Sequence, residues 1–568
     1  MVRLFRLFTR SILINETRTV TLAAIILAAS SLCADILGLL RDRMLAAQFG
    51  AGRELDIYNA AFRIPDFLFL VLFGAISAAF LPVFSHFREK NPKEAWQLTN
   101  NLLSLSILLL SGIATGAFLL MPKLVPLITG GFSVPEQELT IRLSRFLLLS
   151  PIFFGVSSFM SGILHYFKKF LLFSLAPILY NFGIIIGVIF FYPRFGFLGL
   201  GLGVILGAFM HLIIQIPGVM VVGFIPRFYL RPMHEGVYET FILLLPRIPN
   251  LVLTNINILA ITAIASSLAA GSLAIFTFAD NLRAVPVGIF GISFATAVFP
   301  NLSKAWATKD KANFSAMLSS VIKQVSFVVL PILVLFIILR AQIIRVVLGA
   351  GKFDWEDTQL TAAALGLFAV GILAQALIPI IMRAFFAIKD TMTPLVINSF
   401  SIILNIAMAL FFVSFLKSGA FHEAAIFRDI LNLNALSDLS VLALPASFSL
   451  ASIVQLILLA LALRLRLGPF MDREAVFSIF KMFLASLAAA LAAYTSLRPL
   501  AFILDLERFF GIFAQGLIAG LVGSAVYILL SLVLGIREID LFFSSLRKQF
   551  VPQTLPSTNQ TPTPPETK

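Results

Sequence analysis

Residues 170–192 read FLLFSLAPILYNFGIIIGVIFFY and include no charged side chain. An α-helix rises about 1.5 Å per residue, so about 20 apolar residues cross a hydrocarbon core roughly 30 Å thick. Similar runs recur along the chain. We therefore expect an all-α polytopic membrane protein with about 14 transmembrane helices, near residues 20–43, 57–84, 99–121, 143–165, 170–192, 198–223, 238–267, 272–300, 316–339, 359–387, 393–415, 440–463, 477–497 and 511–535.

The composition excludes a soluble fold. Hydrophobic residues make up 59% of the 568 residues and charged residues only 12%, against roughly 25% charge in an ordinary soluble domain. The net charge is +14, but the basic residues are scattered over short loops, so nucleic acid is not expected as a partner. The expected surroundings are membrane lipids. Lysine and arginine are more frequent in one set of alternate loops, and the positive-inside rule then places both termini in the cytoplasm.

The two halves of the chain resemble each other at an offset of about 220 residues. Phe80-Leu81-Pro82 aligns with Val298-Phe299-Pro300, and Pro177 to Asn181 aligns with Pro394 to Asn398. We predict two six-helix lobes in parallel orientation, with alternating access around a site near the midplane. The predicted units are an N-terminal lobe (1–225), a C-terminal lobe (226–468), an additional helix pair (469–545) and a disordered tail (546–568).

Charged residues inside the spans are the first candidates for a site, because an unpaired charge in the bilayer costs several kcal/mol. The second span carries polar residues at i, i+3, i+7 and i+10, which share one helix face. These are Asp56, Asn59, Arg63 and Asp66. The seventh span carries Arg247, Asn250, Thr254 and Asn257, the eighth carries Asp280, Asn281 and Arg283, and Arg41, Asp42 and Asp35 extend the set in the first.

Such stripes face protein or water, and we interpret them as the lining of a transport cavity. The alternative is that these groups only tie helices together, for example Asp56 with Arg41 or Arg53. Oxygens of Asn255, Asn257 and Thr393 form a weak candidate cation site, for which packing hydrogen bonds are the rival explanation. The five histidines have no metal-ligand spacing and no phosphate loop or nucleophile elbow occurs, so we expect neither an enzyme nor a cofactor.

Several motifs resemble those of one family, the lipid II flippases called MurJ or MviN. The similarity covers nearly the whole chain to about residue 540. It is carried by Asp35 to Asp42, Phe49 to Asp56, Ala61 to Pro65, Leu245-Pro246-Arg247, Ala279-Asp280, Pro286 to Gly291, Gly349 to Thr358 and Arg383 to Pro394.

This resemblance implies a fold of the multidrug/oligosaccharidyl-lipid/polysaccharide exporter superfamily, with two lobes around a cationic cavity. It also implies lipid II, an undecaprenyl-diphosphate-linked peptidoglycan precursor, as the cargo, and the bacterial cytoplasmic membrane as the location. The cavity residues that it implies are Arg41, Asp42, Asp56, Arg63, Arg247, Asp280 and Arg283. Guanidinium groups suit this cargo because they grip phosphate in a fork.

The chain also departs from the family pattern. Asp35 stands where the family usually has arginine, Phe69 and Leu70 stand where many members have an arginine pair, and Asn281 replaces an arginine after Ala-Asp. Arg283 lies two residues on, which is about 200° around a helix. The cavity has therefore lost positive charge, and this affects the choice of head group more than the fold.

The hypothesis from the sequence is a lipid II flippase that works by alternating access. Two alternatives stay open. One is an exporter of another polyprenyl-linked glycan or of a small cationic compound, which Asp35 and the missing arginines favour. The other, more remote, is a membrane scaffold or lipid-modifying enzyme of cell-wall synthesis.

Overall fold

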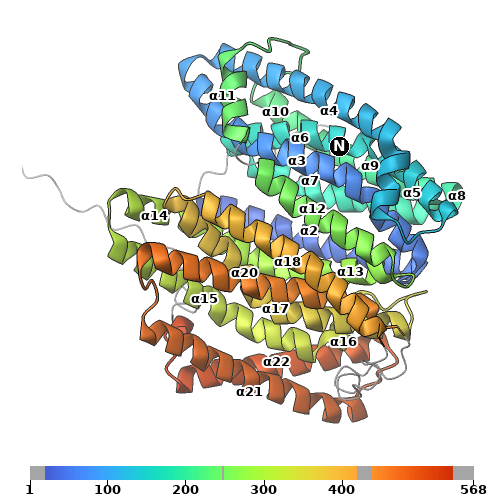
Figure 1. The fold of residues 1–568 in the computed structure, drawn as a ribbon, viewed down its shortest axis with the longest axis vertical. Helices are drawn as coiled ribbons and strands as arrows, with labels where there is room; N and C mark the ends of the chain where they lie inside the picture. The colour runs from blue at the N-terminus through green and yellow to red at the C-terminus, as the bar shows by residue number, and fades with distance from the viewer. Residues whose placement is uncertain (1–19, 246–247, 419–437, 541–568) are drawn as a thin grey trace, which may run out of the picture.

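The structure is a computed structural model that describes residues 20–245, 248–418 and 438–540. Long helices run roughly side by side across the molecule in Figure 1, and no strand occurs in these three ranges. The prediction of an all-α polytopic fold is confirmed. The predicted disordered tail and Arg247 lie outside the described residues.

The first half of the chain begins with three very long helices. Its helices are α2 (Val20–Phe49), α3 (Arg53–Lys90), α4 (Pro92–Ile128), α5 (Val134–Leu147), α6 (Leu149–Tyr166), α7 (Phe170–Ile186), α8 (Tyr192–Phe195), α9 (Phe197–Ile213) and α10 (Ile216–Val221). A π-helical stretch, Gly187–Phe191, joins α7 to α8. The segment with which the sequence analysis began is thus one continuous helical path.

The second half follows a similar order. Its helices are α11 (Glu235–Leu244), α12 (Ile248–Ser266), α13 (Ser272–Pro286), α14 (Ser293–Ala307), α15 (Lys311–Ile338), α16 (Arg340–Val347), α17 (Trp355–Ala387), α18 (Met392–Lys417) and α20 (Ala443–Leu467). A π-helical stretch, Val287–Ile292, follows Pro286, where proline supplies no N–H for the helix ladder. The final pair is α21 (Arg473–Ile503) and α22 (Phe509–Val533).

Within the described residues, 12 helical segments are long and apolar enough to cross a membrane. They correspond to the third through fourteenth predicted spans. The first two predicted spans lie in α2 and α3, which are long helices but are not among these 12. The protein is a multi-pass membrane protein, and the predicted number of about 14 spans stays a prediction.

The spacing of equivalent helices agrees with the predicted repeat. Helix α15 begins 219 residues after α4, and α18 begins 222 residues after α7. The boundary between the halves in space differs from the boundary in the sequence. Helices α11 and α12 both pack against α3 of the first half, and α12 also packs against α18 of the second. The seventh predicted span therefore lies between the two halves.

The two halves meet in a shared apolar core at one end of the bundle, which we call the closed end. It contains the connections at residues 50–52, 267–271 and 348–354. Buried residues of both halves form this core, including Leu45 and Leu55 from α2 and α3 and Leu273 from α13. Other cores lie around Phe84, where residues of the first half pack with Val237 and Leu244 of α11, and around Phe385 in the second half.

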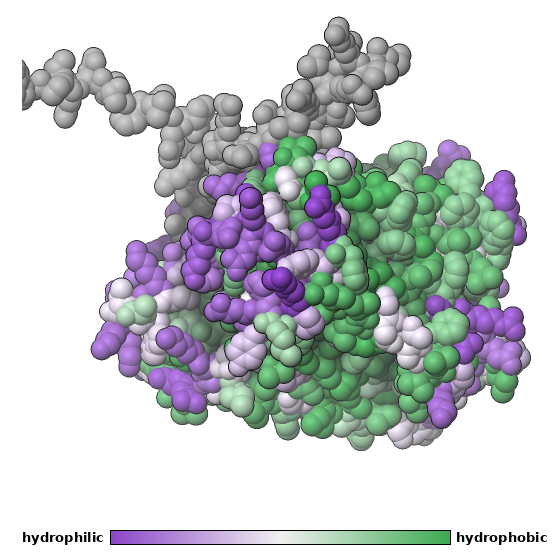
Figure 2. All heavy atoms as spheres, turned by 90° about the horizontal axis from the view of Figure 1, so that it is seen from above, coloured by the Kyte–Doolittle hydropathy of each residue, from purple (hydrophilic) through white to green (hydrophobic). Residues whose placement is uncertain are grey.

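The side of the molecule carries the hydropathy pattern of a membrane protein. Figure 2 looks onto the top of Figure 1 and shows a hydrophobic area that lies between hydrophilic residues on the left and at the right edge. Exposed Leu119 and Leu127 on α4 belong to the apolar exterior of the first half, with exposed fractions of 69% and 73%. Such a surface suits lipid contact and not water.

The helix pair α21–α22 packs on α15 at the bottom of Figure 1. An ion pair fixes this attachment: Lys323 Nζ of α15 lies 3.0 Å from Glu538 Oε1, and the Glu538 side chain is only 3% exposed. Ser478 donates a hydrogen bond of 3.1 Å to the other Glu538 oxygen. The pair α21–α22 is thus held by charge as well as by apolar contact.

Replacing Lys323 by alanine is expected to destabilise this attachment by about 2 kcal/mol, because Glu538 would be left buried without its cation. The estimate is low for a buried pair because the Lys323 side chain is 28% exposed. The measurement is the thermal unfolding midpoint in detergent. The double variant Lys323→Met, Glu538→Leu should recover most of the loss, and an unchanged midpoint in the single variant would show that the ion pair contributes nothing.

Candidate functional site

Arg41 and Asp42 link three helices at the centre of the predicted site. Arg41 donates to Asp42 Oδ1 from Nε (3.0 Å) and Nη2 (2.8 Å), and its Nη1 donates to Asn181 Oδ1 of α7 at 3.0 Å. Asn281 Nδ2 of α13 donates to the other Asp42 oxygen at 2.9 Å. Asp42 therefore connects the two halves, while the Arg41 side chain stays 22% exposed.

The Asp56 carboxylate lies at the start of α13 and not beside Arg41. It is fully buried and accepts hydrogen bonds from the backbone N–H groups of Gly271 (2.7 Å) and Ala274 (2.9 Å). Arg53 Nη1 lies 3.5 Å from the same carboxylate. A carboxylate at a helix N-terminus is stabilised by the free N–H groups and the helix dipole. Asp56 thus fastens α3 of the first half to α13 of the second.

Glycines bring the two backbones together at the closed end. Gly271 has φ +86°, and a Cβ placed on it would lie 1.5 Å from the carbonyl oxygen of Ala51. A Cβ on Gly351 would lie 2.3 Å from the carbonyl oxygen of Ala47, whose partner is the Lys352 N–H at 2.9 Å. Side chains would keep these segments apart, so glycine allows the halves to close.

Arg63 faces the same junction with spare hydrogen-bonding capacity. Its Nη2 lies 3.4 Å from Thr277 Oγ1 of α13, which is a long contact. Its Nε is buried and has no partner among the residues that the structure describes. Asp66, three residues on, is exposed. A buried guanidinium that lacks a full set of acceptors can bind an anion.

Arg283 lies within the second half. It contacts Asp280 of its own helix and Gln375 of α17 through hydrogen bonds. Its guanidinium lies between the rings of Phe368 and Phe448, 5.2 Å and 4.5 Å from their centroids. These partners fix Arg283 among α13, α17 and α20. It therefore does not replace the missing arginine at Asn281, which makes its own bond to Asp42.

The stripe on α12 contacts neighbouring helices. Asn398 Nδ2 of α18 donates to Asn250 Oδ1 at 3.0 Å, and Asn405 Nδ2 donates to Asn257 Oδ1 at 2.9 Å. The hydroxyl of Thr254 donates to a carbonyl of its own helix. The two asparagine pairs repeat after seven residues on both helices, which holds α12 and α18 in register. For these residues the helix-tying alternative describes the contacts better than a cavity lining.

The three residues of the weak candidate cation site have separate partners. Asn255 Nδ2 donates to the Leu251 carbonyl, Asn257 pairs with Asn405, and the Thr393 hydroxyl donates to Asp390 at 2.8 Å. None of these contacts joins one of the three to another. Among the described residues, no group of three or more His, Cys, Asp or Glu could hold a metal ion.

Asp390 instead lies directly before Thr391, the N-cap residue of α18, and its side chain caps the first turn of that helix. Its Oδ1 accepts from the Thr393 N–H at 3.0 Å, and its Oδ2 lies 3.2 Å from Arg466 Nη2. Partial burial alone would raise its pKa, but the hydrogen bonds from Thr393 and the Arg466 charge outweigh burial and lower the pKa of Asp390 below its ordinary value. The carboxylate is therefore stabilised in its charged form.

Replacing Asp390 by alanine is expected to cost about 1 kcal/mol of stability, the usual contribution of an N-cap. Asn caps helices as well as Asp does, so Asp390→Asn should retain the cap and lose only the charge. Because the folded-state pKa is lowered, the charge stabilises above the unfolded value of about 3.9 and its effect disappears as the pH falls below it. Thermal midpoints of the three proteins between pH 7 and pH 3 measure this. A constant difference between wild type and Asp390→Asn over that range would contradict it.

Two asparagines that the sequence analysis used only for the repeat act as equivalent connectors. Asn181 of α7 accepts from Arg41 and donates to the Ala34 carbonyl of α2 at 3.1 Å. Its repeat partner Asn398 of α18 bonds Asn250 of α12. The fifth and eleventh predicted spans thus hold the first and seventh in the same way. The sequence signal for this shared role is that Asn181 and Asn398 align with each other in the internal repeat.

Comparison with known proteins identifies related sequences. The family model described as "Lipid II flippase MurJ" matches residues 45–511. A "Probable lipid II flippase MurJ" of Borreliella burgdorferi is 29% identical over 401 residues, which are 69% of this chain and 78% of that protein. A "Lipid II flippase MurJ" of Burkholderia cenocepacia is 27% identical over 385 residues, 66% of this chain and 74% of that protein.

Solved structures share the fold. A chain described as "Lipid II flippase MurJ, inward closed conformation" has a TM-score of 0.70 at 24% identity and covers 92% of this chain and 100% of its own. An inward-facing multidrug resistance MATE family transporter of the MOP superfamily has a TM-score of 0.63 at 16% identity, covering 79% of this chain and 98% of its own.

Proposed function

Because this chain belongs to the MurJ lipid II flippase family, we propose that it carries lipid II from the inner to the outer leaflet of the bacterial cytoplasmic membrane. The family consists of transporters and not of enzymes. The cargo is a polyprenyl diphosphate with a sugar-peptide head, so its anionic part must cross an apolar barrier. That crossing needs cationic groups that are accessible from one side at a time.

The observation that carries the proposal is the position of Arg41 and Arg63 at the junction of the halves. Arg41 is partly exposed, and Arg63 has a buried Nε without a partner in the described part of the chain. Two guanidinium groups grip a diphosphate better than lysines because each presents a planar fork of donors. We assign Arg41 and Arg63 to the head group. Asp42 and Asp56 join the halves, Asp280 and Arg283 position the wall, and Arg247 keeps its predicted cavity role.

The same contacts provide a route for alternating access. A diphosphate that binds Arg41 competes with Asp42 for the guanidinium. Asp42, which is buried between Arg41 and Asn281 of the second half, is then left without its cation, and this is costly unless water reaches the carboxylate. The ligand thereby favours the state in which the halves have separated at the closed end, as a ligand must if it is to shift a conformational equilibrium.

In this proposal the closed end faces outward and both termini are cytoplasmic. The first lobe comprises residues 1–225, the second 226–468 and the additional pair 469–545.

One alternative cargo is another polyprenyl-linked glycan or a small cationic compound. Asp35 is exposed on α2, and Asn281 and the apolar Phe69 and Leu70 leave fewer positive charges than the family pattern has. A cationic cargo would use Asp35 and Asp66 in place of Arg41 and Arg63.

Complementation tests the proposed function. The full chain is expressed in a bacterium whose own lipid II flippase is being depleted, and growth and outward exposure of the precursor are scored. Rescue of both supports lipid II flipping. Folded, membrane-inserted protein without rescue contradicts it, and binding of the purified chain to a cationic compound would then favour the alternative.

A further inference from the structure

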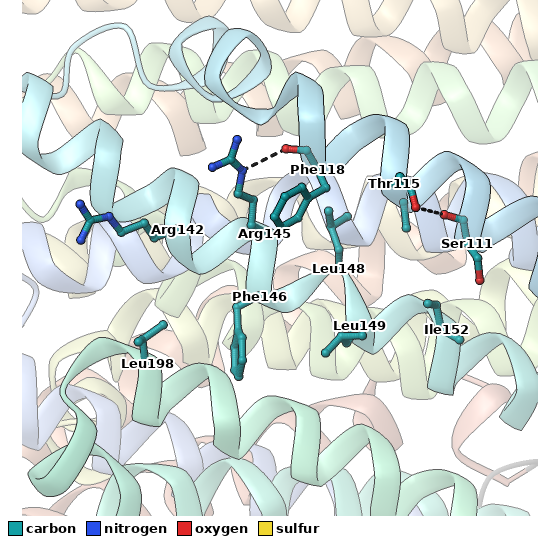
Figure 3. A pocket seen from close by; sticks show the side chains of 11 residues that line it. Ser111, Thr115, Phe118, Arg142, Arg145, Phe146, Leu148, Leu149, Ile152 and Leu198 are labelled. Atoms are coloured by element: carbon teal, nitrogen blue, oxygen red, sulfur yellow. Dashed lines mark hydrogen bonds between the residues drawn. The ribbon is translucent and has the colours of Figure 1, made fainter.

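A groove on the outside of the first half is separate from the junction described above. It is a cavity of about 650 Å³ between α4, α5, α6 and α9, lined mainly by apolar side chains. Figure 3 shows Arg142 and Arg145 at one end of it and Ser111 and Ile152 at the other. Its volume is that of an ordinary small-molecule pocket. Its walls are helices that cross the membrane, so it opens toward lipid.

Arg142 and Arg145 make few contacts with other residues. Arg145 Nε donates to the Phe118 carbonyl at 2.9 Å, and its guanidinium lies 4.7 Å from the Phe118 ring centroid. No bond is found for its two terminal nitrogens among the described residues. Arg142 lies 3.9 Å from Glu138, but both side chains are largely exposed, at 74% and 62%, and such pairs contribute little. Both guanidinium groups can take an anion at the mouth of the groove.

Their location makes the charge unusual. In the orientation proposed above, α4 and α5 are joined at the outer side, where arginine is disfavoured by the positive-inside rule. Two arginines one helical turn apart at that side therefore call for a specific partner. The negative phosphate of a lipid head group is the anion that lies at this depth.

In the second half of the repeat, the equivalent face of α15 is covered by another helix. With the offset of 219 residues between α4 and α15, Ser111 corresponds to Leu330. Leu330 is only 3% exposed because it packs with Met482 and Ala485 of α21. The described residues of the first half, from residue 20 on, include no such helix pair, and Leu108, one turn from Ser111, is 47% exposed. The groove thus lies where the second half has a contact between α15 and α21. In the first half a lipid can occupy this position.

We propose that this groove binds an anionic glycerophospholipid of the outer leaflet. Its phosphate lies between Arg142 and Arg145, and one acyl chain lies along Phe118, Leu149 and Ile152 toward the middle of the bilayer. A transmembrane helix of a partner would need an acidic side chain to match the two arginines, whereas an anionic phospholipid supplies charge and chain together.

The test uses the full chain in nanodiscs of zwitterionic lipid with a trace of phosphatidylglycerol that carries a diazirine in one acyl chain. After illumination, mass spectrometry maps the labelled peptides. We expect label on residues 108–118 and 149–152, and the double variant Arg142→Ala, Arg145→Ala should lower it on the order of tenfold. The matched control Arg194→Ala, Arg498→Ala removes two exposed arginines from the same predicted side and should leave the label unchanged.

Three results would overturn the proposal. The first is equal labelling by a photoreactive phosphatidylcholine that has the same acyl chains as the phosphatidylglycerol probe. The second is labelling by phosphatidylglycerol that does not depend on Arg142 and Arg145. The third is crosslinking between the α4 helices of two copies of the chain in place of lipid labelling. The comparison of the two lipids uses the wild-type chain, so it decides the question even if the double variant fails to fold. Retention of the thermal midpoint identifies a variant that folds.

Discussion

Replacing Arg41 and Arg63 together by alanine should lower the rate of lipid II transport by at least about a hundredfold, because each hydrogen bond to a charged group contributes about 1.5–3 kcal/mol. Both side chains lie at the junction of the halves, and Arg63 has donor capacity that the described residues leave unused. The readout is outward exposure of the precursor in cells depleted of their own flippase.

Arg41 also holds α2 to α7, so its loss could act through structure. Asn181→Ala removes that contact at 3.0 Å and keeps the Arg41 charge. We expect Asn181→Ala to reduce the thermal midpoint and leave transport by the folded protein within about threefold, since it removes two hydrogen bonds between α2 and α7 but no cation from the site. The double arginine variant should instead fail at any precursor level that the cell reaches. Arg41→Lys with Arg63→Lys should be intermediate, since lysine keeps the charge without the fork.

Wild-type transport by the folded double alanine variant would remove the arginines from the head-group site. The cationic-cargo alternative would then gain, and Asp35→Asn would be the next variant, because that exposed carboxylate on α2 is the acidic feature by which the sequence departs from the family pattern.

The sequence predicted the helices well because each apolar run reports directly on the thickness of the membrane. It also located the polar stripes, because charged residues are rare enough in such runs to be conspicuous. The contacts that these polar residues make were harder to predict. Asp56 was paired in expectation with Arg41 or Arg53, and Arg53 does lie 3.5 Å away, but the stronger contacts come from the backbone N–H groups of Gly271 and Ala274. Every residue has such a group, so no sequence pattern marks it.

The polar stripe on α12 shows a second limit of prediction from the sequence. Periodicity placed Asn250 and Asn257 on one face, and the structure agrees, but periodicity does not say what that face meets. The matching asparagines of α18, Asn398 and Asn405, have the same spacing of seven residues. This correspondence is visible in the sequence and would have favoured a helix contact over a cavity. The position of Arg283 required knowledge of α17 and α20, which only tertiary packing supplies.

Replacing Gly271 by alanine is expected to abolish transport, because the closed end could no longer form. A Cβ there would lie 1.5 Å from the Ala51 carbonyl oxygen, far inside contact distance, and backbone on both sides has no flexible group that could move away. The same change would displace the Gly271 N–H, which donates a hydrogen bond of 2.7 Å to the Asp56 carboxylate. The halves would remain apart at this end, and the cargo site could not be sealed from the outside.

Positive φ by itself also penalises alanine, by about 1–2 kcal/mol, and a control must separate this strain from the overlap. Gly223 provides it: its φ is +90°, close to the +86° of Gly271, and a Cβ on it meets nothing within 4 Å. Gly223→Ala should therefore share the strain and still transport. Both variants are compared by precursor exposure and by labelling, with a membrane-impermeant maleimide, of a cysteine at Ser266, which is fully buried beside the closed end.

We expect Gly271→Ala to fail in transport while its Ser266 cysteine becomes more reactive, and Gly223→Ala to match the parent in both. This pattern would separate loss of closure from loss of folding, because an unfolded chain would also lose its thermal midpoint. If Gly271→Ala transported normally, closure at Asp56 and Gly271 would not be a step of the cycle, and separation of the halves would have to be sought at the Asp42–Asn281 link instead.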